Sequence, residues 1–388
     1  MSSAGPAVPC VEPAPPRLAA ADDGCCDVDF DIHGLAGVRL CDASERDAAV
    51  VARQLGPLQG RLEHAPDIVV RFVDRLHEAT PLLLVGHDDA GSDGQDFLLL
   101  RGRHKTRSRA VVPLDRLGAG FEIVCERGAA AVPLLVPILN LAVLSKGVLP
   151  LHASAFVHDG VGVVVTGWSK GGKTEALLGF AQRGARYVGD EWVYVTEDAG
   201  VCGIPEPVRV WDWHLRSAPS YRRRLTARER LRLRAIAGAR ATARVLPAGD
   251  GFRSRWQALL ARQAGLDVAP HRLFGPDAVA PRGSFDVLFL AASHDASDIR
   301  VEPIDPLEVG RRMAFSLQHE RRQLHEAYQK FRFAFPWSAS AALERADEME
   351  RKLLRRAFAG KPAFLVRHPY PVALDALAEA MSDYCRHA

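Results

Sequence analysis

The stretch Leu151–Val195, LHASAFVHDGVGVVVTGWSKGGKTEALLGFAQRGARYVGDEWVYV, decides the fold of this 388-residue chain. At its centre the segment GWSKGGKT, Gly167–Thr174, matches the pattern G-x-x-x-x-G-K-[ST] at every fixed position. The apolar run before it, Val161–Thr166, is typical of a buried strand, and Glu175–Arg183 after it is typical of a helix. A strand, a glycine-rich turn and a helix in this order predict a phosphate-binding loop, or P-loop.

The residue types in this loop are those that bind a nucleoside triphosphate. Its glycines let the backbone aim successive N–H groups at phosphate oxygens, and the following helix adds its positive end. Lys173 is spaced to reach the outer phosphates, and the Thr174 hydroxyl is spaced to ligate Mg²⁺. We therefore expect ATP and Mg²⁺ as cofactors, held by Gly167, Ser169, Lys170, Gly171, Gly172, Lys173, Thr174 and Glu175.

Two adjacent carboxylates, Asp190 and Glu191, lie within the next predicted strand, Arg186–Val195. In phosphoryl transfer a carboxylate at this place can take a proton from the attacking hydroxyl or hold the metal. Because neighbouring residues on a strand point to opposite faces, we expect one of the two to face the nucleotide and the other to support neighbouring structure. His152 lies on the strand before the P-loop strand, where a lone histidine is more often structural than functional.

The composition is that of an ordinary globular protein. The chain is 48% hydrophobic and 25% charged, and its net charge of +3 gives no argument for binding nucleic acid. Its seven cysteines include no C-x-x-C pair, which favours reduced thiols. The N-terminus lacks the pattern of a signal peptide, and prolines interrupt the most apolar run, residues 129–144. We therefore predict a cytoplasmic protein without a membrane or nucleic-acid partner, and the sequence leaves a homo-oligomer open.

Changes of pattern along the chain predict an α/β protein in three parts. Residues 1–26, rich in Ala, Pro and Gly, predict a disordered tail, residues 27–128 a β-rich, mainly antiparallel N-terminal module, and residues 129–388 the P-loop domain. The strands expected in the module are Gly37–Cys41, Asp67–Phe72, Asp96–Leu100, Ser108–Val112 and Phe121–Cys125, with a helix at Ser44–Gln54.

The P-loop domain is expected to be helical at several places outside the central stretch. Single helices are predicted at Leu134–Lys146, Pro306–Leu324, Ser338–Phe358 and Val372–Arg386, and a further strand at Ser284–Ala292. Residues 245–283 are predicted to be irregular apart from one helix near Arg255–Gln263.

The central stretch resembles HPr kinase/phosphorylase and its relatives, whose catalytic core has the phosphoenolpyruvate-carboxykinase type of fold. The motifs that carry the resemblance are His152, Gly160–Val163, Gly167–Glu175, Arg183–Gly184 and the acidic pair Asp190–Glu191. The resemblance implies an enzyme that transfers the γ-phosphoryl group of ATP to a hydroxyl. It implies that Asp190 is the general base with His152 hydrogen-bonded nearby, and that Lys173 and Thr174 hold the phosphates and Mg²⁺.

The chain departs from that family in two ways that leave the acceptor open. Glu191 stands where the family has a second Asp, and the Arg-Gly-Leu-Gly type of loop does not follow. The acceptor is then a serine of a peptide or protein, or a small metabolite. Glu191 and Glu206 are candidate metal ligands beside Thr174, and Arg209 is a candidate phosphate contact.

An arginine-dense helical segment, residues 216–244, is either an exposed helix face or a clamp for an acidic acceptor or for phosphates. Two other functions stay open. The first is a nucleotide-binding regulatory or scaffold protein with little or no turnover, and the second is a hydrolase that passes the phosphate to water.

Overall fold

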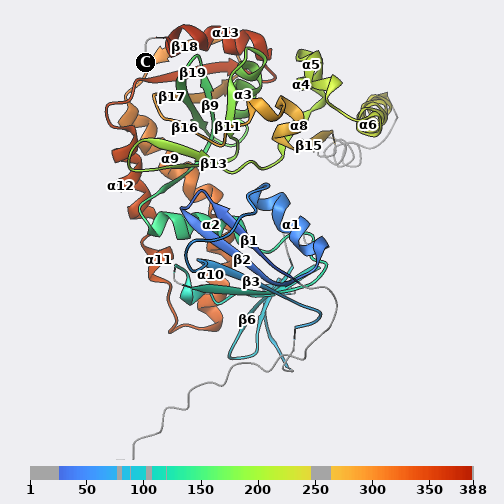
Figure 1. Ribbon diagram of the computed structural model, residues 1–388, viewed down its shortest axis with the longest axis vertical. Coiled ribbons are helices and arrows are strands. Elements are labelled where there is room, and N and C mark those ends of the chain that lie inside the picture. Colours follow the sequence, from blue (N-terminus) through green and yellow to red (C-terminus); the bar gives the residue numbers. More distant parts are fainter. Residues whose placement is uncertain are drawn as a thin grey trace, which may run out of the picture.

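The computed structural model describes residues 26–76, 81–87, 89–101, 107–118, 120–245 and 264–386. Within them the protein is a mixed α/β structure with two large sheets, one in the lower and one in the upper half of Figure 1. The helix predicted near Arg255–Gln263 lies outside the described residues, and so does the predicted tail except Cys26, where the first strand begins. No helix among the described residues is long and apolar enough to span a membrane.

The N-terminal sheet has eight strands in the order β1-β2-β3-β8-β7-β6-β5-β4. They are β1 Cys26–Ile32, β2 Ala36–Ala43, β3 Ile68–Val73, β4 Leu83–Val85, β5 Ala90–Ser92, β6 Phe97–Arg101, β7 Arg107–Val111 and β8 Phe121–Glu126, followed in the chain by α2 Leu135–Ser145. All five predicted strands are present, whereas β1, β4 and β5 were not predicted. The sheet is mainly antiparallel, as expected, but β3 at its centre pairs in parallel with both β2 and β8.

Helices from both parts of the sequence cover the N-terminal sheet. Helix α1, Glu45–Leu55, begins at Ser44, whose hydroxyl accepts from the Asp47 amide in a capping box. From the C-terminal part, α10 Arg322–Ala334 packs on the same sheet, and the rings of Phe97 and Phe331 lie edge to face at 5.6 Å. One hydrophobic core therefore runs from this sheet into the P-loop half.

The second sheet carries the P-loop. Its strands follow the order β16-β13-β12-β9-β10-β17-β19-β18, with β11 also paired to β9. They are β9 Leu149–His158, β10 Val161–Gly167, β11 Arg186–Gly189, β12 Trp192–Val195, β13 Gly200–Gly203, β16 Arg282–Ser284, β17 Val287–His294, β18 Arg300–Pro303 and β19 Ala363–Pro369. The expected β9–β10 hairpin is present, with His158 opposite Val161. Strands β10, β17 and β19 run parallel, so their carboxyl ends meet at one edge of the sheet.

Helices cover this sheet and extend from it (Figure 1). They are α3 Lys173–Gln182, α4 Asp212–Ser217, α5 Pro219–Arg223, α6 Ala227–Val245, α8 Pro270–Phe274, α9 Pro306–Glu320, α12 Ala346–Phe358 and α13 Leu374–Cys385. The short helix α11 Ala341–Glu344 lies instead against α2 and α12. A separate two-stranded sheet pairs β14 Val208–Trp211 with β15 Gly265–Val268.

Several predicted elements are divided in the structure. The helix predicted at Pro306–Leu324 ends at Glu320, and a new helix starts after Arg321, whose guanidinium pairs with Asp347 and Glu350 of α12. The helix predicted at Ser338–Phe358 consists of α11 and α12. The prediction of an irregular 245–283 is wrong for its described part, because β15, α8 and β16 lie there.

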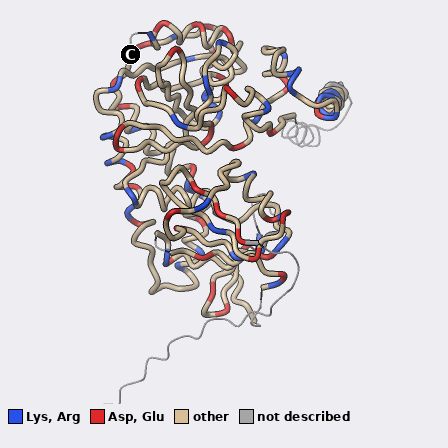
Figure 2. The backbone as a smooth tube through the Cα atoms, viewed as in Figure 1, with Lys and Arg blue, Asp and Glu red and all other residues tan. Residues whose placement is uncertain are grey.

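Helix α6 projects away from the rest of the protein and is dense in basic residues (Figures 1 and 2). The exposed arginines of α5, α6 and the turn between them are Arg222, Arg223, Arg224, Arg228, Arg232 and Arg234. Their exposure agrees with the interpretation of this segment as an exposed helix face.

Candidate functional site

The P-loop leads from β10 into α3 as the sequence predicts, and close contacts require its glycines. Gly172 precedes α3 with φ +109°, and a Cβ there would lie 2.0 Å from Nε2 of His368. A Cβ on Gly167 would lie 2.3 Å from the carbonyl oxygen of Ala291 on β17. The side chains of Ser169 and Lys170 are exposed at the outer side of the loop. The loop is thus packed tightly against the carboxyl ends of β17 and β19.

Lys173 lies inside the loop, with only 6% of the residue exposed. Its Nζ donates to the carbonyl oxygen of Trp168 at 3.1 Å and to that of Gly167 at 3.3 Å. Burial lowers the pKa of Lys173, while the charges of Glu191 and Asp190 act in the opposite direction. A cation held by backbone carbonyls at this position is available to an anionic phosphate.

Asp190 is the buried centre of the site. Its carboxylate accepts from the Thr174 hydroxyl at 3.0 Å and 3.2 Å and from the Ser154 hydroxyl. Burial, followed by the nearby charge of Glu191, raises the pKa of Asp190 to about 6, although the two hydroxyls and Lys173 oppose the shift. A carboxylate with this pKa is mostly ionised at neutral pH and is matched to accepting a proton there.

The predicted strand Arg186–Val195 is broken at its two acidic residues. Glu191 adopts a left-handed conformation with φ +64°, which separates β11 from β12. Its backbone carbonyl still accepts from the Ala153 amide of β9. The expectation of a regular strand through Asp190 and Glu191 is therefore wrong. The two carboxylates have different partners, since Asp190 contacts Thr174 and Glu191 contacts His152, although both charges act on Lys173. Such strain in a non-glycine residue is typical of functional sites.

His152 lies between two carboxylates. Its Nε2 is 3.1 Å from Oε2 of Glu191, and its Nδ1 is 3.1 Å from Oε1 of Glu320 at the end of α9. Burial favours the neutral ring, but the two carboxylates outweigh this effect and raise the pKa of His152. His152 and Ser154 are two residues apart on β9 and share one face, so this strand reaches both acidic residues.

Two buried histidines fix the loop and the helix that follows it. His214 of α4 lies 3.1 Å from Oε1 of Glu175, and this hydrogen bond and charge hold the pKa of Glu175 below its usual value against the effect of burial. His368 of β19 is fully buried, with Nε2 2.8 Å from the Gly171 carbonyl oxygen. Glu175 thus helps to fix α3, in addition to the nucleotide-binding role predicted for it.

The structure brings His152, Lys173, Thr174, Asp190 and Glu191 together. Four further residues of the site escaped prediction, namely Ser154, His214, Glu320 and His368. Only Ser154 could have been identified from the local sequence, because it lies two residues from His152 on the same predicted strand.

The other two predicted ligands lie in different surroundings. Glu206 follows β13, and its charge acts on the buried hydroxyls of Tyr187 and Tyr194, whose pKa values are raised chiefly by burial. Arg209 of β14 pairs with Asp267 of β15 at 2.9 Å. Among the described residues, no three His, Cys, Asp or Glu side chains form a group able to hold a metal ion. A metal at the loop would therefore depend on phosphate and water oxygens as well as the protein.

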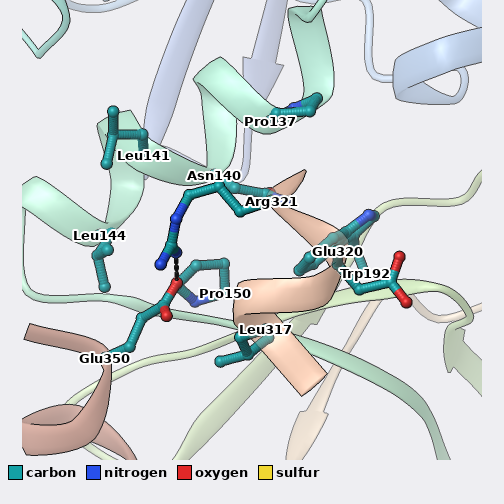
Figure 3. Close-up of a pocket in the computed structure, with 10 residues that line it drawn as sticks. All are labelled: Pro137, Asn140, Leu141, Leu144, Pro150, Trp192, Leu317, Glu320, Arg321 and Glu350. Carbon is teal, nitrogen blue, oxygen red and sulfur yellow. Dashed lines mark hydrogen bonds and ion pairs between the residues drawn. The ribbon is translucent and has the colours of Figure 1, made fainter. Parts of the chain in front are cut away.

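A small cavity lies between helices α2, α9 and α12 (Figure 3). Its ten lining residues include Trp192 and Glu320, which both contact His152, and the ion pair of Arg321 with Glu350. The space open to the centre of a water molecule is about 20 Å³, which is room for one water and too little for a nucleotide. One carboxylate oxygen of Glu350, Oε2, is buried without a hydrogen-bond partner.

Comparison with known proteins does not assign the chain to a family. No family model matches it, and no curated protein matches its sequence. Among solved structures, the HPr(Ser) kinase/phosphatase from Coxiella burnetii aligns with 40% of this chain and 77% of its own, at 18% identity and a TM-score of 0.20. A likeness at this level says nothing about the activity of this chain.

Proposed function

We propose that this protein is an ATP-dependent kinase that transfers the γ-phosphoryl group to a hydroxyl acceptor. The observation that carries the proposal is the contact between Thr174, which ends the P-loop motif, and the buried carboxylate of Asp190, at 3.0 Å. A carboxylate at this position is within reach of the terminal phosphate of a nucleotide bound by the loop. This contact supports a role for Asp190 in the acid–base chemistry of phosphoryl transfer.

Each residue then has a definite part in the reaction. The loop amides and Lys173 bind the outer phosphates and stabilise the charge that develops on them. Asp190 takes the proton of the acceptor hydroxyl while that oxygen bonds to the γ-phosphorus and the bond to the β-phosphate oxygen breaks, which releases ADP. Glu320 holds one nitrogen of the His152 ring, and the other nitrogen orients Glu191 beside the transferred group.

The oxygen ligands at the loop fit Mg²⁺. The Thr174 hydroxyl and the largely exposed Glu191 carboxylate are hard oxygen donors of the kind that this ion prefers. Bound there with the nucleotide, Mg²⁺ would neutralise phosphate charge. Glu206, by contrast, acts on Tyr187 and Tyr194, and we propose no metal role for it.

On this proposal the acceptor approaches on the β9 flank of the loop. Helix α9 brings Glu320 to His152 there, and its His319 ring lies 4.8 Å from the ring of Trp168 in the loop. Trp168 and Phe315 are more than half exposed on this side. A serine of a peptide or protein, or a small hydroxyl compound, would approach Asp190 from this flank.

The test is the stoichiometry of phosphate transfer. The protein is incubated with Mg-ATP labelled at the γ-phosphate and with serine-containing peptides, sugars and polyols, while phosphorylated acceptor and ADP are measured together. The proposal predicts one phosphorylated acceptor for each ADP with at least one acceptor class. ADP and free phosphate alone would identify a hydrolase, and tight binding of ATP with no ADP at all would identify a regulatory nucleotide-binding protein.

A further inference from the structure

The P-loop has two chemically different flanks, because its strand β10 has different neighbours on its two sides. On one side β9 carries His152 and Ser154 toward the acidic residues. On the other side β17 and β19 run parallel to β10. In open α/β sheets, ligands bind outside the carboxyl ends of such strands. The chain therefore offers a second surface beyond β17 and β19 that the phosphoryl transfer itself does not use.

Two consecutive residues of α3 contact the two flanks. Thr174 contacts Asp190 on the β9 flank, and Glu175 contacts His214 on the opposite flank. If the terminal phosphate lies at Asp190, the rest of the nucleotide extends across the start of α3 toward His214. The groups beyond His214 are thus candidates for holding the nucleoside.

Aromatic side chains occupy this place. The ring centroids of Trp213 on α4 and His214 are 4.0 Å apart. The ring of Tyr370, just after β19, packs edge to face against Trp213, with a distance of 5.5 Å between the ring centroids. Tyr370 is 46% exposed, and the charge of Glu175 reaches it and helps burial to raise its pKa. An aromatic ring that packs against another ring on one side and faces solvent on another can stack with a nucleotide base.

We propose that Tyr370, supported by Trp213, is the stacking platform for the base of the bound nucleotide. The inference rests on the proposed function, since it takes the terminal phosphate to lie at Asp190. The other exposed aromatic ring at the loop, Trp168, packs with His319 on α9 and lies on the acceptor flank. The two rings therefore separate nucleotide recognition from acceptor recognition.

Comparing ATP with a ligand that lacks the nucleoside tests this inference. Dissociation constants for Mg-ATP and for Mg-tripolyphosphate are measured by calorimetry on the wild type and on Tyr370→Ala, Tyr370→Phe and Trp168→Ala. The exposed Trp337, distant in sequence and 96% exposed, supplies the control variant Trp337→Ala. We expect Tyr370→Ala to weaken ATP binding roughly ten-fold or more while tripolyphosphate binding stays unchanged. Tyr370→Phe and Trp337→Ala keep both affinities.

Three results would overturn the inference. Tyr370→Ala could leave ATP binding unchanged, or it could weaken both ligands equally, which would indicate a distorted loop. Alternatively, Trp168→Ala could be the variant that loses the preference for ATP over tripolyphosphate. Failure of the wild type to bind either ligand is a distinct outcome, which removes the proposed function and this inference with it.

Discussion

The hydroxyl of Thr174 lies 3.0 Å from Oδ2 of Asp190, so the end of the P-loop and the acid of the following segment share one hydrogen bond. The same carboxylate accepts from Ser154 of β9. Phosphate binding, a candidate metal ligand and a candidate general base therefore meet at one buried carboxylate. Because Asp190 is only 3% exposed, each of these contacts affects its charge strongly.

Removing the Thr174 hydroxyl while keeping its shape should weaken metal-dependent nucleotide binding. Thr174→Val deletes both the hydrogen bond to Asp190 and the oxygen offered to Mg²⁺. Without this oxygen Mg²⁺ is held less well beside the phosphates, so we expect Mg-ATP binding to weaken by roughly ten-fold or more. Thr174→Ser should restore it, and the exposed Thr242→Val serves as the control. Wild-type affinity of Thr174→Val in the presence of Mg²⁺ would exclude a metal role for this hydroxyl.

His368 should affect the P-loop as a whole, because its Nε2 forms a hydrogen bond with the carbonyl oxygen of Gly171 in the loop. His368→Leu leaves that buried carbonyl without its donor, which costs about 1–3 kcal/mol. We expect a lower melting temperature and a loss of affinity that is equal for Mg-ATP and Mg-tripolyphosphate, unlike the selective loss expected for Tyr370→Ala. His368→Gln, which keeps a donor, should lose less, and the exposed His325→Leu is the control. Unchanged affinity in His368→Leu would show that this contact does not shape the loop.

Glu350 should make the protein less stable as the pH rises toward neutral. Burial raises its pKa to about 7 from the ordinary 4.5, although Arg321 opposes the shift. Between these two values the unfolded chain loses the proton that the folded protein keeps, so the free energy of unfolding falls as pH increases through this window. Across the whole window this titration lowers the free energy of unfolding by roughly 3 kcal/mol.

Urea unfolding between pH 4 and pH 8 tests this effect of Glu350. We expect Glu350→Gln to show a shallower decline of stability with pH than the wild type. Glu348→Gln, an exposed residue of the same helix, should follow the wild type. If Glu350→Gln and the wild type give parallel curves, the buried carboxylate does not titrate in this window.

The local parts of the site could be predicted from the sequence, and the parts assembled over long distances could not. Strand β10, the loop and α3 follow from a motif and from periodicity within one short stretch. The break at Asp190 was not predicted, because it depends on the left-handed conformation of Glu191, which apolar flanking residues do not reveal. Glu320 and His368 reach the site only through the packing of α9 and the parallel pairing of β17 with β19. Strand β19 itself was not predicted, so the role of His368 could not be recognised.

The central claim is that Asp190 acts in chemistry rather than in binding. Its most direct test measures Mg-ATP affinity and the rate of ADP formation, with an acceptor that the wild type phosphorylates, for the wild type, Asp190→Asn and the exposed control Asp295→Asn. The account predicts that Asp190→Asn binds Mg-ATP about as tightly as the wild type, while its turnover falls roughly a hundred-fold or more. Asp295→Asn should match the wild type in both measurements. Wild-type turnover in Asp190→Asn would contradict the account, because the buried carboxylate would then not be the base.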